Sequence, residues 1–177
     1  MAEDISPPWS IGEHGHLELV GDQAAVQFLP DGIVGRGALK ADAGVVPWES
    51  IRHGFTLGVP AVGRVGTRLI HGFGGAGLYD ELFVSAAGAG FDAYTWSLGR
   101  PSISPYAIRV RNATEAMANF LGLAPPIHGG RPAVCLLGDQ AVGPALVAAC
   151  LSSSSWSRLM AHRRVKYVVD EFVDGKR

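Results

Sequence analysis

The chain has 177 residues and a formal net charge of −1, so its size is that of one domain, or of one domain with an appended segment. Hydrophobic residues make up 47% of the sequence and charged residues 18%, a composition that excludes an intrinsically disordered chain. The nearly neutral charge gives no electrostatic basis for broad binding to nucleic acid or to a membrane surface.

The N-terminus and the two cysteines bear on the compartment. Residues 1–8 are acidic and then proline-rich, without the basic and apolar regions of a signal peptide. The longest apolar-rich run, residues 141–151, is too short to span a bilayer. Cys135 and Cys150 both have apolar neighbours, which favours two buried free thiols over a disulfide. These features together predict a cytoplasmic protein.

Residues 1–15 are polar and contain proline and glycine, which indicates an N-terminal arm with Trp9 as a docking anchor. Residues 16–20 alternate between apolar and polar positions. We therefore expect a short strand there, with Leu17 and Leu19 on one face.

Three consecutive antiparallel strands are expected to organise the chain. The first two form a hairpin over residues 24–35, where Asp31 and Gly32 tolerate the positive φ of a tight turn. The third strand begins at Val45-Val46. Pro47 cannot donate a hydrogen bond to a neighbouring strand, so it belongs at a sheet edge or a bulge.

Trp48 and Ile51 follow this proline and lie three residues apart, so the strand period of two fails between them. A bulge at this point would let both side chains reach the same core. We predict both as core residues, because buried aromatic side chains usually serve packing.

The hairpin followed by Val46, Trp48 and Ile51 resembles the early strands of bacterial pleckstrin-homology-like domains. Over about residues 16–122, this resemblance implies a curled sheet or small barrel closed at one end by a helix. Lipid-binding members of that family carry several Lys and Arg near the first hairpin. This chain has Pro30-Asp31-Gly32 there, with Arg36 as the nearest base, which argues against phosphoinositide binding.

Further strands are predicted beyond this corner. Residues 55–57 continue the strand, and the glycine- and proline-punctuated stretch 58–66 is an irregular loop that could face a partner. Another strand is expected at residues 68–71. Residues 81–86 and 91–98 are expected to form a hairpin. The best core candidates of its second arm are Trp96 and Leu98.

A strand is predicted at residues 106–110, followed by a helix that begins at Asn112. Glu115 lies three residues after Asn112, in the capping-box position, and Gly122 supplies a stop at the other end. Apolar residues recur at helical spacing between these ends. We expect this helix to close the open end of the barrel.

Residues 124–132 form the clearest linker, and the pattern beyond it is helical. Asp139 is expected to cap a helix that ends near Leu151, and Trp156, Leu159 and Met160 are expected to pack in the interior. A stripe at helical spacing follows: Val165, Val168, Val169 and Phe172. Three partners could bury this stripe, namely the barrel, the preceding helix or another subunit.

The predicted fold is therefore α+β, with an antiparallel curled sheet or small barrel closed by a helix. Its four parts are an arm, a barrel domain, a linker and a C-terminal helical segment, at residues 1–15, 16–123, 124–132 and 133–177.

The glycine run Gly72–Gly77 has the GxGxxG spacing of dinucleotide-binding proteins, and Asp92 lies where a ribose-binding acid could be. A βαβ unit also needs a crossover helix, for which the strand-like residues after Gly77 leave no room. A flexible glycine loop is the favoured interpretation, and nucleotide binding is the alternative.

Other catalytic and metal-binding patterns are weak. Residues 152–155 are serines that suit helix capping, and no GxSxG motif accompanies them. Glu13, His14 and His16 lie on one strand and would form a poor metal cage. We therefore expect no catalytic residue, no metal site and no cofactor.

The function predicted is a non-catalytic protein-interaction or scaffold module that binds a protein partner or a second copy of itself. The basic residues proposed for this contact are Arg64, Arg68, Arg158, Arg163, Arg164 and Lys166. Two alternatives stay open: a small nucleotide-binding enzyme that uses the glycine run, and nucleic-acid binding through the basic C-terminal helix.

Overall fold

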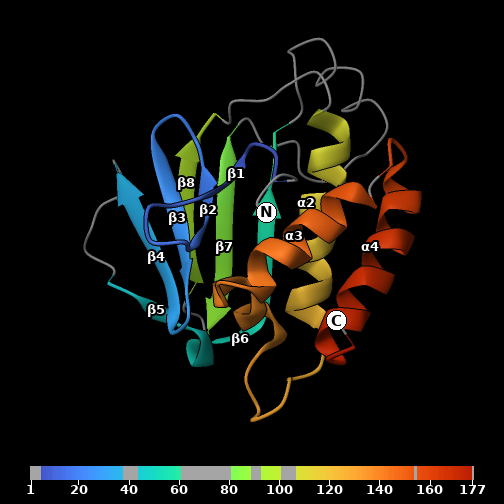
Figure 1. Ribbon diagram of the computed structural model, residues 1–177. Helices are drawn as coiled ribbons and strands as arrows, with labels where there is room; N and C mark the ends of the chain where they lie inside the picture. Colours follow the sequence, from blue (N-terminus) through green and yellow to red (C-terminus); the bar gives the residue numbers. More distant parts are fainter. Residues whose placement is uncertain are drawn as a thin grey trace.

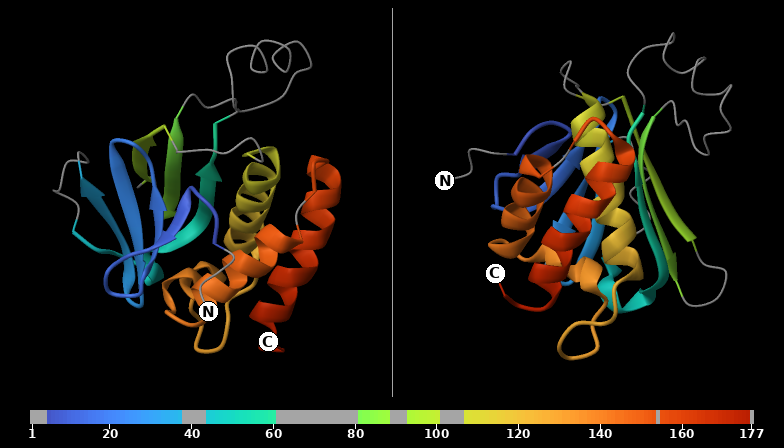
Figure 2. Two further views of the ribbon diagram at one scale, coloured as in Figure 1. Left: turned by 45° about the horizontal axis from the view of Figure 1, so that its top comes forward. Right: turned by 90° about the vertical axis from the view of Figure 1, so that its right-hand side faces the viewer.

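The computed structural model describes residues 5–37, 44–60, 81–88, 93–100, 107–153 and 155–176. Two antiparallel sheets form one side of the molecule and a group of helices forms the other, as Figure 1 and Figure 2 show. The predicted α+β class, with a curled antiparallel sheet followed by helices, is confirmed.

The first sheet has five strands in the order β1-β2-β3-β4-β5, and neighbouring strands are antiparallel. Its strands are β1 (Trp9–Ile11), β2 (Leu17–Val20), β3 (Ala24–Leu29), β4 (Gly32–Gly37) and β5 (Val46–Pro47). The predicted hairpin is the pair β3-β4, and Leu17 and Leu19 are both buried in β2, as predicted.

The second sheet has three strands in the order β6-β7-β8, again antiparallel. They are β6 (Ile51–Gly58), β7 (Leu82–Gly88) and β8 (Ala93–Gly99). The pair β7-β8 is the second predicted hairpin, and its core candidates Trp96 and Leu98 are buried. The strand expected at residues 68–71 lies outside the described residues.

The chain passes from one sheet to the other at the predicted irregularity after Pro47. A short 3-10 helix, η1 (Trp48–Ser50), separates β5 from β6. Because this turn interrupts the strand period, Trp48 and Ile51 are both buried, as expected for core residues. The indole nitrogen of Trp48 donates a hydrogen bond to the carbonyl oxygen of Leu29 at 2.8 Å.

The sheets also meet beyond the end of β8, where the backbone nitrogen of Asp22 donates to the carbonyl oxygen of Arg100 at 2.8 Å. Over the described residues, the strands nevertheless form two separate sheets. Of the two predicted forms, a curled sheet or a small barrel, the described residues show a curled pair of sheets that is not closed into a barrel, and the 3-10 turn η1 is the point where the chain leaves the first sheet for the second.

The helices pack on the sheets in sequence. Helix α2 (Ala107–Leu123) lies along β6, and the 3-10 helix η2 (Ala133–Gly138) contacts β3 and β4. Helix α3 (Val142–Ser152) packs on α2, and α4 (Arg158–Val173) packs on both of them. Figure 2 shows α4 on the outside of this helical group.

Asp139 caps the start of α3, as predicted. Its carboxylate oxygen Oδ1 accepts hydrogen bonds from the backbone nitrogens of Ala141 and Val142, each at 2.9 Å. These two N–H groups lie at the beginning of the helix, where no preceding turn supplies a carbonyl partner. The carboxylate therefore satisfies them in place of a backbone acceptor.

One hydrophobic cluster extends through both sheets and the helices. Under the first sheet, the Phe28 ring stacks with Trp48 at 6.5 Å and lies 5.7 Å from Trp9. The predicted stripe of α4 enters the same cluster through three buried valines: Val165, Val168 and Val169. Helices α2 and α3 cover this stripe within the chain. That residues 16–123 form a domain of their own, separate from the helical segment, stays a prediction.

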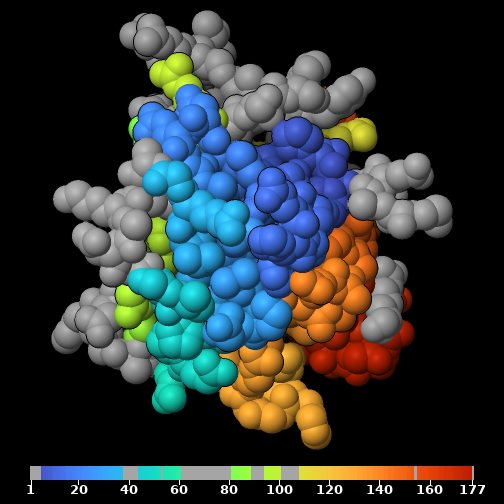
Figure 3. Space-filling view, turned by 60° about the vertical axis from the view of Figure 1, so that its left-hand side comes forward, coloured from blue at the N-terminus to red at the C-terminus, as the bar shows by residue number. Residues whose placement is uncertain are grey.

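The N-terminal segment is anchored from residue 5 onwards. Trp9 is only 2% exposed, and its indole nitrogen donates to the hydroxyl of Thr114 on α2 at 3.0 Å. The side-chain amide of Gln140 donates to the carbonyl oxygen of His14 at 3.1 Å. Figure 3 shows this N-terminal part, in dark blue, against the orange helical segment. Strand β1 thus ties the first sheet to the helices.

The turn between β3 and β4 differs from the prediction. Leu29 pairs with Gly32, so Pro30 and Asp31 form the turn, and neither Asp31 nor Gly32 adopts a positive φ. Gly32 serves another purpose, because a Cβ atom at this position would collide with the carbonyl oxygen of Val46. The glycine therefore allows β5 to approach β4.

The strand predicted at residues 106–110 is wrong from residue 107, where α2 already begins. Asn112, predicted as the helix cap, lies inside this helix. Its side-chain amide instead donates to the carbonyl oxygens of Ser155 and Trp156, at 3.3 and 3.1 Å. Asn112 thus holds the loop before α4, a role that its position in the sequence does not reveal.

Gly122, predicted as a helix stop, lies one residue before the end of α2. A Cβ atom here would lie 3.0 Å from both the backbone nitrogen and the backbone oxygen of Phe55 in β6. The glycine therefore lets the helix lie close to the edge of the second sheet.

Candidate functional site

The structure brings together four of the six basic residues proposed for partner binding. Arg158, Arg163, Arg164 and Lys166 all lie on α4. The other two, Arg64 and Arg68, lie outside the described residues, as do the glycine run Gly72–Gly77 and Asp92.

Large apolar side chains are exposed at the start and along the outer face of α4. The exposed fraction is 50% for Trp156 in the preceding loop, 64% for Leu159, 41% for Met160 and 63% for Tyr167. The prediction that the first three pack in the interior is therefore wrong. Leu159 and Met160 lie on the opposite side of α4 from its buried valines, because their helical angles differ from those of the stripe, and Trp156 lies in the loop before the helix.

Basic residues share this outer face. Leu159, Arg163 and Tyr167 follow one another at intervals of four residues, so they lie in a row along the helix. Both Arg163 and Arg164 are exposed and make no hydrogen bond or ion pair with any residue that the structure describes. We call the following set the α4 patch: Trp156, Leu159, Met160, Arg163, Arg164 and Tyr167.

Arg158 has a structural contact instead. Its guanidinium nitrogen Nη2 lies 3.7 Å from the carboxylate oxygen Oε2 of Glu115, whose side chain is 8% exposed. Arg111 contributes a second cation, with Nε 3.2 Å from Oε1 of the same carboxylate. A buried carboxylate needs such partners because its desolvation is costly. This cluster ties α4 to α2.

Lys166 also has a partner, since its amine contacts the carboxylate of Asp170 one helical turn later. This pair is exposed and contributes little to stability. Of the four predicted cations on α4, Arg163 and Arg164 are therefore the ones whose charge the described fold leaves available for a ligand.

The loop before α4 is held in place although Trp156 is half exposed. The Arg109 guanidinium lies 5.0 Å from the centre of the Trp156 ring, a cation–π contact. The backbone carbonyl oxygen of Trp156 accepts a hydrogen bond from the side-chain amide of Asn112. These contacts fix the aromatic end of the α4 patch before any partner binds, which lowers the entropic cost of binding.

A cleft that was not predicted from the sequence lies at the other end of α2. Its volume is about 540 Å³, and its lining residues come from three places: η1 with the start of β6, the end of α2 with the residues just after it, and the start of η2 with the residues just before it. The floor is apolar, with Phe55, Leu121 and Val134, and two charged residues, Glu49 and Arg52, line it.

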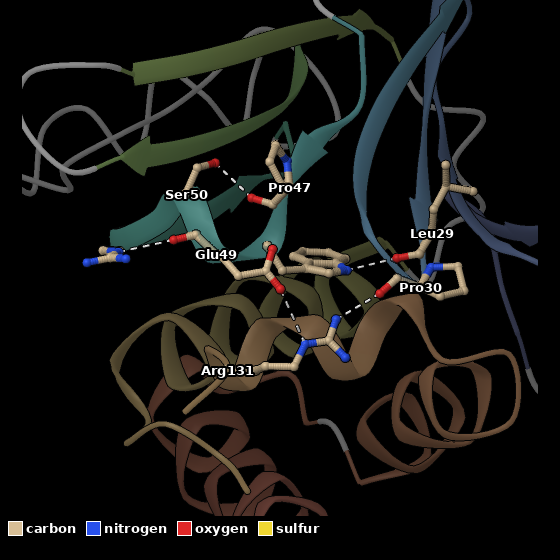
Figure 4. A network of polar contacts seen from close by, with 8 residues as sticks. Leu29, Pro30, Pro47, Glu49, Ser50 and Arg131 are labelled. Carbon is tan, nitrogen blue, oxygen red and sulfur yellow. Dashed lines mark hydrogen bonds and ion pairs between the residues drawn. The ribbon is translucent and has the colours of Figure 1, made fainter. Parts of the chain in front are cut away.

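Arg131 lies between two lining residues of this cleft, Gly130 and Pro132, and Figure 4 shows its polar contacts. Its Nη2 donates to the carbonyl oxygen of Pro30 at 2.8 Å, and its Nε lies 3.7 Å from Oε1 of Glu49. The side chain thus bridges the β3-β4 turn and η1. Since Arg131 neutralises Glu49, Arg52 is the charged residue lining the cleft whose guanidinium has no carboxylate partner among the described residues.

The two cysteines offer little for catalysis. Cys135 and Cys150 are buried free thiols, as predicted. Burial raises the pKa of Cys135, an effect that nearby Arg131 partly opposes. A thiol with a raised pKa is a poor nucleophile near neutral pH. Within the described ranges, no group of three or more His, Cys, Asp or Glu side chains is arranged to hold a metal ion.

Comparisons of this chain with family models, with curated proteins and with solved structures gave no match. The resemblance to pleckstrin-homology-like domains therefore stays a prediction from the sequence. Among the described helices, none is both long and apolar enough to span a membrane.

Proposed function

We propose that this protein is a non-catalytic interaction module that binds a protein partner through the α4 patch. The observation that carries the proposal is the exposure of Leu159, Met160 and Tyr167 along one side of α4, whose other side is buried, and of Trp156 in the loop just before it. Large apolar side chains that gather in this way, rather than scatter singly over a surface, mark interaction sites.

The composition of the patch suits a protein interface. Trp, Tyr and Arg are the residue types most enriched among those that dominate binding energy. Here Trp156 and Tyr167 supply the aromatic anchors, and Arg163 and Arg164 flank them. Because both arginines are exposed and without ion pairs among the described residues, the complementary surface would be apolar at its centre and acidic at its rim.

A protein partner is favoured over nucleic acid by the charges on the same helix. Lys166 is paired with Asp170, and Glu171 and Asp174 follow. These carboxylates would lie close to any phosphate backbone that contacted Arg163 and Arg164, and the whole chain has a net charge of −1. Nucleic-acid binding usually rests on a larger excess of basic residues.

Photo-crosslinking tests the proposal directly. A benzoylphenylalanine placed at Tyr167 should crosslink to a defined protein in the host cell. The matched control carries the same group at Val45, which is 42% exposed near the far edge of the first sheet. The pair Arg163→Glu and Arg164→Glu, introduced with the probe at Tyr167, should weaken the crosslink while the protein stays folded.

Three results would contradict the proposal. They are the same crosslinked proteins at Tyr167 and Val45, a crosslink that the charge reversals leave unchanged, and a complex that nuclease treatment removes. The last result would favour the nucleic-acid alternative. A crosslinked product of twice the chain mass would identify a second copy as the protein partner.

A further inference from the structure

The cleft beside Arg131 goes beyond the proposed function, because it lies away from the α4 patch and has the properties of a small-molecule site. Its volume of about 540 Å³ falls within the range of roughly 300–1,000 Å³ that is typical of ligand pockets. Such pockets combine an apolar lining with a few polar groups that fix the orientation of the ligand.

The cleft lies where three segments meet: the η1 corner with the start of β6, the C-terminal end of α2, and the residues that lead into η2. Gly54 is among its lining residues, and a Cβ built there would have no heavy atom closer than 3.9 Å. The side chains of Phe55, Leu121 and Val134 provide its apolar lining.

Arg52 supplies the polar group that would orient a ligand. Its Nε donates to the carbonyl oxygen of Glu49 at 3.1 Å, which fixes the side chain at the cleft. The terminal guanidinium nitrogens make no hydrogen bond within the described part of the chain. The Glu49 carboxylate thus has Arg131 as its ionic partner, and the Arg52 guanidinium, bonded only to a backbone carbonyl, leaves one uncompensated positive charge at the cleft.

We infer that this cleft binds a small organic monocarboxylate with an apolar body. The carboxylate would accept hydrogen bonds from the terminal nitrogens of Arg52, and the apolar body would lie on Phe55, Leu121 and Val134. An arginine matches the planar geometry of a carboxylate with two parallel hydrogen bonds. The remaining volume suits a ligand with a hydrocarbon chain or ring rather than a small inorganic ion.

Calorimetry with octanoate as the probe and octanol as its neutral counterpart tests this inference on the full chain. Octanoate should bind, and octanol should bind more weakly. Arg52→Gln should weaken octanoate binding by about tenfold, which corresponds to the loss of one charge-assisted contact. Arg36→Gln removes an exposed arginine from β4 and should leave binding unchanged.

A second pair of variants tests the location. Ala124 lines the cleft and is half-buried, so Ala124→Phe should fill the space and abolish octanoate binding. The adjacent Leu123 is 84% exposed and does not line the cleft, so Leu123→Phe is the matched control. Circular dichroism confirms that each variant is folded before its binding is measured.

The inference is overturned if octanoate gives no binding heat at millimolar concentration, or if octanol binds as well as octanoate. It is equally overturned if folded Ala124→Phe binds octanoate as the wild type does. None of these measurements involves the α4 patch, so their failure and the failure of the proposed function are distinguishable.

Discussion

Tryptophan occurs in two opposite settings in this molecule, the core under the first sheet and the α4 patch. Trp48 is fully buried with its indole nitrogen bonded to Leu29, and Trp9 is buried with its nitrogen bonded to Thr114. Trp156 leaves half of its surface in solvent, next to Arg109. The fold thus depends on the first two rings, whereas the third adds apolar surface that the fold does not require.

The same contrast holds within α4 itself. Its inner face contributes Val165, Val168 and Val169 to the single core, while its outer face exposes Leu159 and Tyr167. A helix needs only one apolar face to pack on its own protein. The fold therefore does not require the additional apolar residues on the outer face, and in the proposed function they serve an external contact.

Removing residues 124–177 should have the largest effect on stability, because it deletes the helical part of the core. The truncation deletes Val134, Leu137, Leu146 and the valines of α4, all of which lie in the same core as the sheets. Because this core is shared, we expect the truncated chain to lose its cooperative unfolding transition and its native circular dichroism spectrum, contrary to the sequence-based prediction of a separate domain at residues 16–123. A truncated chain that unfolds cooperatively would instead support an independent domain that ends near residue 123.

Replacing Trp48 and Trp156 one at a time tests whether the two settings differ in their contribution to stability. Trp48→Ala should lower the free energy of unfolding by about 3–5 kcal/mol, because it leaves a large cavity beside Phe28. Trp156→Ala should lower it by less than about 1 kcal/mol, because the ring is half exposed. Urea unfolding of both variants measures the difference, and equal losses would refute the assignment of the two settings.

Two glycines test how closely the first sheet is packed at its edge. Gly32→Ala should lower the free energy of unfolding by about 1–3 kcal/mol, because the new Cβ would collide with the backbone of Val46. Gly44→Ala is the matched control, since a Cβ there has no heavy atom within 4 Å. Chemical denaturation should show little change for the control. A neutral Gly32→Ala would mean that β5 can move away without cost.

His162 gives the smallest expected effect and lies between the two faces of α4. Burial lowers the pKa of this side chain below its ordinary value of 6.5, with a further contribution from Arg158 and an opposing one from Glu115. Because the unfolded chain then binds the proton more readily, stability should decrease as the pH falls below about 6.5.

In the wild type, the centres of the His162 and Phe120 rings lie 5.6 Å apart. The variant His162→Phe keeps an aromatic ring at this position but removes the titratable group. It should remove this part of the pH dependence, as thermal unfolding at a series of pH values would show. The same acid dependence in the variant and the wild type would assign the effect to other groups.

Local patterns were sufficient to predict the elements whose contacts are near in sequence. The β3-β4 hairpin, the buried corner at Trp48 and Ile51, and the cap at Asp139 each depend on residues within a few positions. The inner stripe of α4 was also correct, because helical periodicity alone defines it.

Contacts between distant segments were not predictable in the same way. Asn112 has the residue type and spacing of a helix cap, yet its partners are Ser155 and Trp156, more than forty residues later. Gly122 resembles a helix stop but is required by Phe55 in another element. The cleft near Arg52 is built from three separate stretches, so no local pattern in the sequence marks it.

The most direct test of the central claim changes the outer face of α4 and measures the native mass of the complex isolated from host cells. The double variant Leu159→Ser and Tyr167→Ser changes only exposed positions of the helix. We predict a folded protein with an unchanged unfolding midpoint that is recovered without its partner. A variant that still forms a complex of the wild-type mass would contradict the assignment of the α4 patch as the binding surface.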